Sequence, residues 1–327
     1  MKKIEGYNID YDFSGFRKIA DLVYFDGPFL SHYVSAKGDD YLFYWVDRDD
    51  PDYKSIRTRG ATVSLTRRLK WPDDYFFLAQ SIQYKFYTLN NYPITTDFKD
   101  GHSHDLSYSI TLMRNSYDSP IYTRSGSELS VMAQLTPPYS LLSSKDYTDM
   151  EVVDKYKLVE YYKINIRGSW MLNLIGDVVL NTRFRLGYLG YYNKNIGTAP
   201  FGRYYLGGDA LASYVYDGRE VVPMRGYENY KLSSSEGSAV YDRFTLELRQ
   251  PIIESAAATI WALGFLEGGN AWNSIKDFEP FKMYNSAGLG IRLYMPMFGL
   301  IGFDWGYGFD GLYGGSHFHF SIGTSID

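Results

Sequence analysis

Hydrophobic and polar residues alternate along most of the chain after Gly60, which is the pattern of extended strands. The clearest example is the segment 298–309, FGLIGFDWGYGF. One face carries Ile301, Phe303, Trp305, Tyr307 and Phe309, and the other carries Gly302, Asp304, Gly306 and Gly308. A soluble strand buries its large residues and exposes its polar ones, and a single strand cannot show which face meets water.

The same alternation recurs often enough to predict about eleven strands. Their ranges are 61–65, 76–86, 106–112, 129–135, 163–170, 180–188, 240–250, 258–267, 285–295, 298–309 and 317–323. The repeated small or polar face indicates an inside-out arrangement, with large apolar residues pointing outward. Segment 258–267 alternates least, because Trp261 and Phe265 share parity with Glu267. We therefore expect something on the inside to cover that strand.

The connections between these segments differ in length. Short ones such as 173–177 and 296–297 contrast with the long stretch 191–238. Short turns at one rim and long loops at the other are typical of outer-membrane barrels. The sequence therefore predicts an all-β fold, a transmembrane antiparallel β-barrel, in one domain over residues 59–327.

Residues 1–58 follow a different pattern and form an unplaced N-terminal segment. Short strands are possible at 19–25, 32–35 and 41–45, but the charged run 47–54 (DRDDPDYK) interrupts them. Whether these strands contribute to the barrel stays open. The start, MKKIEGYNIDYDF, has no apolar stretch and does not resemble a secretory signal. If the protein is exported, we expect this chain to be a fragment or a mature form.

Composition narrows the class further. Lys and Arg number 33 against 38 Asp and Glu, so the formal charge of -5 does not favour nucleic acid as a partner. The absence of cysteine excludes disulfides, thiolate metal sites and a cysteine nucleophile. No run approaches the roughly 20 apolar residues of a membrane helix. Transmembrane strands need only about ten alternating residues, so an aromatic content of 18% and a mean hydropathy of -0.30 both suit a barrel.

The longest connection contains VVPMRGYENYKL, residues 221–232. Gly226 frees the backbone beside Arg225, and Tyr227 offers a large anchoring surface. This combination suits a loop that folds back into the structure and is held there.

Several motifs resemble the C-terminal barrel of the BamA family, the bacterial surface antigen family of outer-membrane protein insertases. They are RRLKWPDDYF (67–76), SPIYTRSGSELSVMAQLTPPYS (119–140), GYLGYYNK (187–194), MRGY (224–227), FLEGGNAW (265–272), SAGLGIRLYMPMFGLIGFDWGYGF (286–309) and FHFSIG (318–323). Each motif alone is weak, but their common order over about 60–323 is specific.

The resemblance implies a barrel of sixteen strands in the outer membrane of a Gram-negative bacterium. The eleven segments would be the sixth to the last strand, so we expect an N-terminally truncated chain without the first five strands and the periplasmic domains. The implied function is the assembly and insertion of nascent β-barrel proteins through a weak strand seam. The implied partners are outer-membrane lipid, the nascent barrels and accessory lipoproteins. Alternatives are a two-partner-type secretion pore or translocation factor of the same superfamily and a passive porin.

The resemblance also implies a loop latch, consisting of Arg225, Gly226, Tyr227, Glu247 and Glu267. In the family the RGY-type motif folds into the lumen, where the arginine meets an acidic residue on each of the next two strands. The parity agrees, because Glu247 shares its polar face with Arg243. A planar guanidinium suits bidentate binding of a carboxylate. The alternative is a set of solvated lumen charges that contribute about 0 to 1 kcal/mol. Glu267 replaces the aspartate that is more usual in relatives.

The last strand is the expected side of the seam, with Phe318, Phe320 and Gly323. Gly323 either permits a kink or merely ends the strand. The chain continues to Asp327, whereas relatives commonly end on an aromatic residue.

Other residue clusters predict no chemistry. His102 and His104 share a face near Asp105, as do His317 and His319, but lumen-wall and loop positions are favoured over a metal site. The glycines at 288 and 290 lack the remaining features of a dinucleotide motif, and we expect another backbone to pack close to them. The stretch KLSSSEGS lacks a nucleophile elbow. We therefore predict no enzyme activity, no cofactor and no metal.

Overall fold

The computed structural model describes residues 16–24, 28–35, 40–44, 54–92, 94–209 and 217–323, the first three ranges by the path of the backbone only. The chain divides into two compact units, Met1–Lys54 and Ser55–Asp327. In the first unit, β1 (Phe16–Tyr24), β2 (Pro28–Ser35) and β3 (Asp40–Tyr44) form an antiparallel sheet in that order. They overlap the three short strands expected there. The second unit begins earlier than residue 59, because strand pairing already starts at Ser55.

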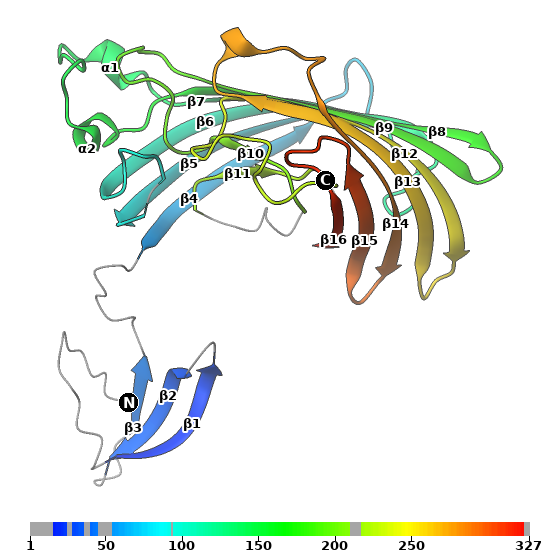
Figure 1. Ribbon diagram of the computed structural model, residues 1–327, viewed down its shortest axis with the longest axis horizontal. Coiled ribbons are helices and arrows are strands. Elements are labelled where there is room, and N and C mark those ends of the chain that lie inside the picture. Colours follow the sequence, from blue (N-terminus) through cyan, green and yellow to red (C-terminus); the bar gives the residue numbers. More distant parts are fainter. Residues whose placement is uncertain are drawn as a thin grey trace. The chain divides into compact units, whose positions relative to one another are not determined.

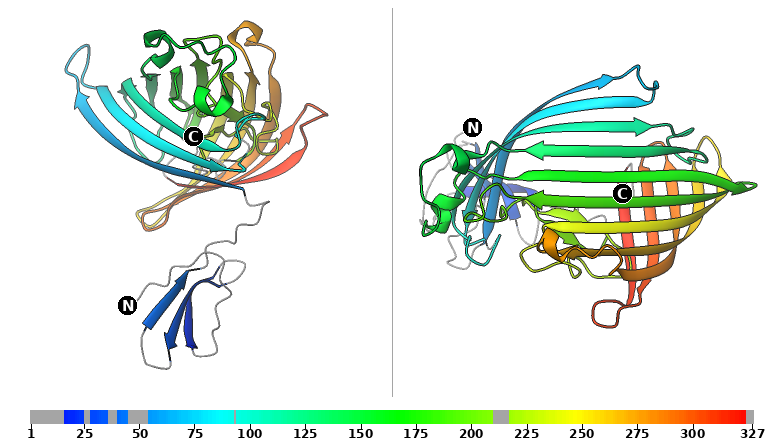
Figure 2. Two further views of the ribbon diagram at one scale, coloured as in Figure 1. Left: turned by 90° about the vertical axis from the view of Figure 1, so that its left-hand side faces the viewer. Right: turned by 90° about the horizontal axis from the view of Figure 1, so that it is seen from above.

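The second unit is built on an antiparallel sheet of 11 strands (Figure 1). These are β4 (Ser55–Arg68), β5 (Phe76–Asn90), β6 (Gly101–Asn115), β7 (Gly126–Leu135), β8 (Tyr162–Ile175), β9 (Val178–Gly190), β12 (Val240–Glu254), β13 (Thr259–Trp272), β14 (Tyr284–Met295), β15 (Gly299–Gly308) and β16 (Ser316–Gly323). Each of the eleven predicted segments matches one of them, and only 258–267 and 298–309 extend past their strand, by one residue at one or both ends. The predicted fold class is thus confirmed. The sheet is strongly curved (Figure 2).

Sequence neighbours pair throughout the sheet, with one exception: β12 pairs with β9. The intervening β10 (Tyr204–Leu206) and β11 (Glu220–Val222) form a separate parallel pair inside the long connection. Within the described residues, the sheet ends at β4 on one side and β16 on the other. The other elements are the short helices α1 (Tyr139–Leu142) and α2 (Val152–Lys155) and the 3-10 turn η2 (Ile275–Asp277).

Connections alternate between the two rims, because consecutive antiparallel strands run in opposite directions. One rim has the connections 69–75, 116–125, 176–177, 255–258 and 296–298. The other has 91–100, 136–161, 191–239, 273–283 and 309–315. The longest connections all lie on the second rim, which is the asymmetry that the sequence predicted.

The outer face of the sheet exposes large apolar side chains, as the inside-out pattern predicted. Phe303 is 57% exposed, Leu289 64% and Phe318 84%. Residues of the opposite parity on the same strands, such as Asp304 and Ser321, are buried. A face of this kind is stable against hydrocarbon and costly in water. In the part of the chain that the structure describes, no helix is long and apolar enough to cross a membrane.

The inner face is covered by the 191–239 connection, which we call the inner loop. Tyr204, Leu206 and Met224 of this loop are completely buried in one cluster with residues of the sheet such as Leu189. Phe201 stacks on Tyr87 with ring centroids 3.9 Å apart. Burial of these apolar side chains stabilises the packing of the inner loop against the inner face of the sheet.

A second cluster explains the weak alternation of β13. Trp261, Leu263 and Phe265 point inward and are buried together with Val179 and Tyr122. The Tyr122 ring, from the connection between β6 and β7, lies 5.6 Å from Trp261 in an edge-on arrangement. Tyr122 is thus part of the cover that the sequence led us to expect over this strand.

Candidate functional site: the arginine at the tip of the inner loop

The inner loop is held in shape before it reaches its tip. β10 and β11 pair in parallel, and Gly208 and Met224 exchange backbone hydrogen bonds of 3.1 and 3.0 Å. Lys163 of β8 donates to the carbonyl of Gly202 at 2.7 Å and forms an ion pair with Glu220. These bonds tie both arms of the loop to each other and to the sheet.

Charged groups also hold the outer part of the loop. The Thr96 amide donates to Glu236 at 2.6 Å, and hydrogen bonds from the Thr96 side chain and amide lower the pKa of Glu236. Tyr92 donates to Asp217 at 2.6 Å. Burial raises the pKa of Asp217, but hydrogen bonds from Arg219 and Tyr92 more than offset this, so its pKa is lowered. The connection 91–100 thus holds the inner loop through hydrogen bonds to Asp217 and Glu236.

Arg225 lies at the loop tip, and its side chain donates to three carboxylates. Its Nε and Nη2 donate to Oε1 of Glu267 at 3.0 and 2.7 Å, and its backbone amide donates to Oε2 at 2.9 Å. Nη2 also donates to Glu247 at 3.2 Å, and Nη1 donates to Asp304 at 3.2 Å. The Phe265 ring lies 3.5 Å from the guanidinium carbon, which adds a cation–π contact.

Each of these carboxylates has at least one further arginine partner. Glu247 accepts from Arg183 at 3.0 Å and Arg249 at 2.6 Å. Glu267 accepts from Arg243 at 2.7 Å. Asp304 forms a two-pronged pair with Arg292 at 2.9 and 2.8 Å. We call these eight residues the latch network.

Burial gives the latch network its energetic weight. The side chains of Arg225, Glu247, Glu267 and Asp304 are at most 6% exposed. Removing one member of a buried ion pair costs about 3 to 5 kcal/mol, because an uncompensated charge remains. An exposed pair contributes only about 0 to 1 kcal/mol. The side chains of the latch network that meet at Arg225 are buried, so the larger cost applies to them. The alternative of solvated lumen charges does not describe these side chains.

Gly226 fits a place where two backbones meet. Its φ is +86°, and a Cβ there would lie 2.8 Å from both the amide of Gly308 and the Cβ of Ser286. A Cβ on Gly306 would in turn lie 2.8 Å from the Gly226 amide. That amide donates to Nε2 of His319 at 2.8 Å. The tip therefore reaches β16 by a hydrogen bond to a buried histidine.

Tyr227 fixes the other side of the tip. It is completely buried, and its hydroxyl donates to the carbonyl of Asn285 at 2.6 Å and to Asp310 at 2.7 Å. Burial, followed by the hydrogen bond to Asp310, raises the pKa of the Tyr227 hydroxyl. The three residues of the RGY motif thus contact all five strands from β12 to β16 and the connection 309–315.

The structure brings together the residues that the family resemblance assigned to the loop latch. Arg225, Glu247 and Glu267 meet within hydrogen-bond distance, and the longer glutamate side chain at 267 reaches two donors of the arginine. Asp304 and His319 were missed. A usable signal existed for Asp304, because it is the one acidic residue on an otherwise glycine-rich inner face of its strand. The role of these residues as a latch stays a prediction.

The expected seam residues lie on β16. Phe318 points outward opposite Trp305, and the Phe320 ring lies 5.0 Å from Phe303. Gly323 is the last residue of the strand, with a φ of +146°. The kink expected at this glycine concerns 324–327 as well, which lie outside the described residues. The role of β16 in a seam stays a prediction.

The histidines and glycines set aside above have structural partners. His102 and His104 hydrogen-bond with the hydroxyls of Thr88 and Tyr84 at 3.3 and 2.8 Å. The expectation that another backbone packs close to glycines 288 and 290 holds for Gly288, where a Cβ would clash with the carbonyl oxygen of Trp305. It does not hold for Gly290, whose nearest neighbour is the Asp304 carboxylate. The loop backbone approaches Gly306 and Gly308 instead. Among the described residues, no group of three metal-ligating side chains comes together.

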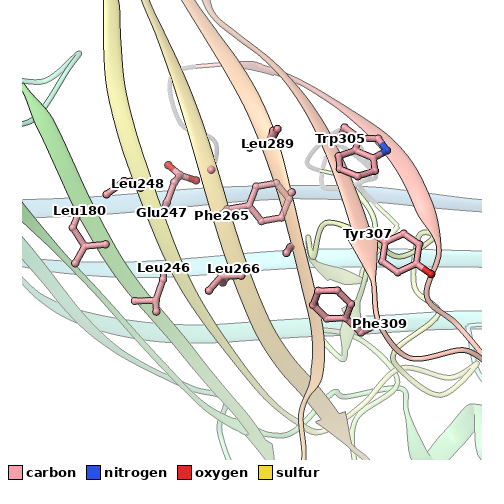
Figure 3. A pocket seen from close by; sticks show the side chains of 13 residues that line it. Leu180, Leu246, Glu247, Leu248, Phe265, Leu266, Leu289, Trp305, Tyr307 and Phe309 are labelled. Atoms are coloured by element: carbon pink, nitrogen blue, oxygen red, sulfur yellow. The ribbon is translucent and has the colours of Figure 1, made fainter.

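A hollow of about 710 Å³ opens where β9 and β12 to β15 meet (Figure 3). Most of its lining consists of exposed apolar side chains of the outer face, including Leu246, Leu289 and Trp305. The small residues Ala287 and Gly264 also line the hollow. The hollow therefore belongs mainly to the apolar surface of the sheet, although Glu247 of the latch network and Phe265, whose ring contacts Arg225, also line it.

Comparisons with known proteins agree with this geometry. The family model described as "Omp85 superfamily domain" matches residues 5–326. Among solved structures, the chain is similar to BamA from Haemophilus ducreyi in a crystal structure lacking POTRA domains 1–3, with a TM-score of 0.58 and 16% sequence identity. The match covers 88% of this chain and 57% of that chain, so the present chain spans little more than half of its length. A search of curated proteins finds no match.

Proposed function

The chain belongs to the Omp85 superfamily, and from that premise we propose that it is an outer-membrane β-barrel assembly factor, which folds and inserts nascent β-barrel proteins. Proteins of this superfamily are non-enzymatic barrels of membrane transport and assembly. The chain is a barrel protein of the Gram-negative outer membrane, and its exposed apolar face contacts the lipid there. The assembly role is the finer step that we add.

The latch network is the observation that carries the proposal. A passive pore needs no buried arginine that crosses from a loop to three strands, and charges of this kind are costly unless they are paired. Here Arg225 donates to acidic residues on β12, β13 and β15 at once. This bond pattern fits a loop whose position determines how the C-terminal strands are arranged.

The proposed mechanism uses the edge of the sheet. β16 pairs only with β15 in the described sheet, so its other side presents backbone N–H and C=O groups. Such an edge can template an incoming strand, and strand addition supplies backbone hydrogen bonds to a nascent chain in a medium without water. No covalent bond forms or breaks. Phe318 and Phe320 would then face lipid while the new strand pairs beside them.

From the same proposal it follows that nascent outer-membrane β-barrel proteins are the clients and accessory lipoproteins the partners. The latch holds the inner loop against the C-terminal strands while the edge of β16 stays accessible. Through the bond between Gly226 and His319, the loop tip is in direct contact with the strand that would receive the client.

The test is assembly activity after loss of the arginine. Arg225→Ala, reconstituted in liposomes, should fold a small client barrel several-fold more slowly than the wild type, while its own strand content remains. Arg203→Ala, which removes an inner-loop arginine outside the latch network, is the matched control. Equal client folding by wild type and Arg225→Ala would refute the assembly role of the latch.

Planar-bilayer recordings separate the alternatives. A steady large conductance without client folding would favour a porin, and translocation of an unfolded chain without insertion would favour a two-partner-type secretion pore. A closed or flickering pore together with client insertion is the result that we expect.

A further inference from the structure

The inner face carries a row of three arginines on three adjacent strands. Arg185 of β9 is the direct register partner of Arg167 on β8 and of Arg243 on β12. Direct cross-strand neighbours have Cβ atoms about 4.5 to 5.5 Å apart, and like charges in such pairs are destabilising. A row of this kind is stable only if negative charge offsets it.

The described carboxylates offset only part of this charge. Arg167 forms an ion pair with Glu128 at 3.2 Å, and Arg243 forms one with Glu267 at 2.7 Å. Glu267 is shared with Arg225 of the latch network. Arg185 has no hydrogen bond or ion pair within the described residues. The middle of the row is thus the position with an uncompensated charge.

A count over the surrounding wall gives the same result. Seven guanidinium groups share five carboxylates, an excess of two positive charges. The guanidinium groups are those of Arg167, Arg183, Arg185, Arg225, Arg243, Arg249 and Arg292, and the carboxylates are those of Glu128, Asp209, Glu247, Glu267 and Asp304. Glu220, the next acidic side chain near the row, is neutralised by Lys163. The loop residues 210–216, ALASYVY, carry no charge.

The row also has an unpartnered donor and an exposed end. The Nε of Arg243 is buried without an acceptor within the described residues, and the Arg167 side chain is 55% exposed. The row ends in small residues on both sides, since Ser130 is the register partner of Arg167 and Gly269 that of Arg243. The N–H donors of the row are therefore flanked by small side chains at both of its ends.

We propose that Arg167, Arg185 and Arg243 form a binding site for a tetrahedral oxyanion such as phosphate or sulfate. The planar fork of each guanidinium matches the oxygens of such an anion, and a dianion would neutralise the excess of two charges. The bound group is either a free anion or the phosphate of a lipid headgroup. The inner position of the row, opposite the exposed apolar face, favours the free anion.

The experiment is calorimetric titration of the purified full chain with sodium phosphate and sodium sulfate, in a zwitterionic detergent at neutral pH and constant ionic strength. We expect saturable binding of both anions and none of added chloride. Arg185→Ala should weaken phosphate binding about tenfold or more, because it removes a charged donor pair. Arg185→Lys should retain part of the affinity, since it keeps the charge.

Lys145→Ala is the matched control, because it removes one exposed positive charge in a loop away from the row. Arg167→Ala is the second variant if Arg185→Ala fails to fold, since its side chain is the most exposed of the three partners in the row. A wild type without saturable phosphate binding, or equal affinities for Arg185→Ala and Lys145→Ala, would overturn the proposal.

Nanodiscs distinguish the two sources of the anion. Equal phosphate affinity in discs of phosphatidylcholine with and without phosphatidylglycerol would assign the site to a free anion. Weaker phosphate binding in the discs with phosphatidylglycerol would show competition by a lipid headgroup and would exclude the free anion as the occupant in the membrane.

Discussion

Glu267→Gln is the most informative single change in the latch network. The glutamine is isosteric but neutral, so it removes charge without leaving a cavity. In the native protein this carboxylate accepts three bonds from Arg225 and one from Arg243, and all three side chains are at most 6% exposed. The change leaves two buried guanidinium groups with less negative charge around them.

The expected magnitude follows from burial. Loss of one partner from a buried ion pair costs about 3 to 5 kcal/mol, whereas loss from an exposed pair costs at most about 1 kcal/mol. Glu247 and Asp304 keep contact with Arg225, so we expect the lower end, about 3 kcal/mol. This free energy corresponds to roughly a hundredfold change in an equilibrium constant.

Hydrogen exchange followed by mass spectrometry measures this change at the loop itself. The Arg225 amide donates to Glu267, so exchange of the peptide 221–232 should accelerate about a hundredfold in Glu267→Gln. Glu279→Gln is the matched control, because Glu279 pairs with Lys282 at 3.8 Å in a 65% exposed position. Exchange in Glu267→Gln within a few-fold of both wild type and control would refute the argument from burial. Glu267→Asp keeps the charge but shortens the side chain, so its exchange rate should lie between those of the wild type and Glu267→Gln.

Three further predictions concern the surroundings of the tip. His319→Ala removes the acceptor of the Gly226 amide and should destabilise the docked loop by about 1 to 3 kcal/mol, measured as faster exchange of that amide; an unchanged rate would contradict the contact. Gly306→Ala places a Cβ 2.8 Å from the Gly226 amide and should displace the tip, so protease should cleave the inner loop faster than in Gly311→Ala, where a Cβ meets nothing within 4 Å. The lowered pKa of Glu236 means that its bonds to Thr96 stabilise the loop above its unfolded pKa of about 4.3 and are lost as pH falls through the folded value. Loop protection should therefore decrease below about pH 4 in the wild type, and a wild type that matches Glu236→Gln at every pH would exclude this contribution.

Period-two alternation in the sequence was sufficient to predict the strands of the large sheet and which of their faces points outward. In β15, Phe303 and Trp305 lie outward and Asp304 inward because successive side chains of any extended strand point to opposite faces. The separation into two faces is local to each strand, and the recurrence of a small or polar face over many strands indicated which face points outward. The proximity of Arg225 to Glu247 and Glu267 came from family resemblance and from parity together.

Only the tertiary structure decided which inward residues meet. Asp304 and His319 are direct register partners, and the loop tip packs beside them, at Gly306 and Gly308. The row of Arg167, Arg185 and Arg243 spans segments far apart in sequence and exists because of the pairing of β8, β9 and β12. Alternation assigns each residue to a face, but the position of one strand along the next is set by hydrogen bonds between strands and by the packing of the loop. These contacts are not local, and a single sequence does not contain them in readable form.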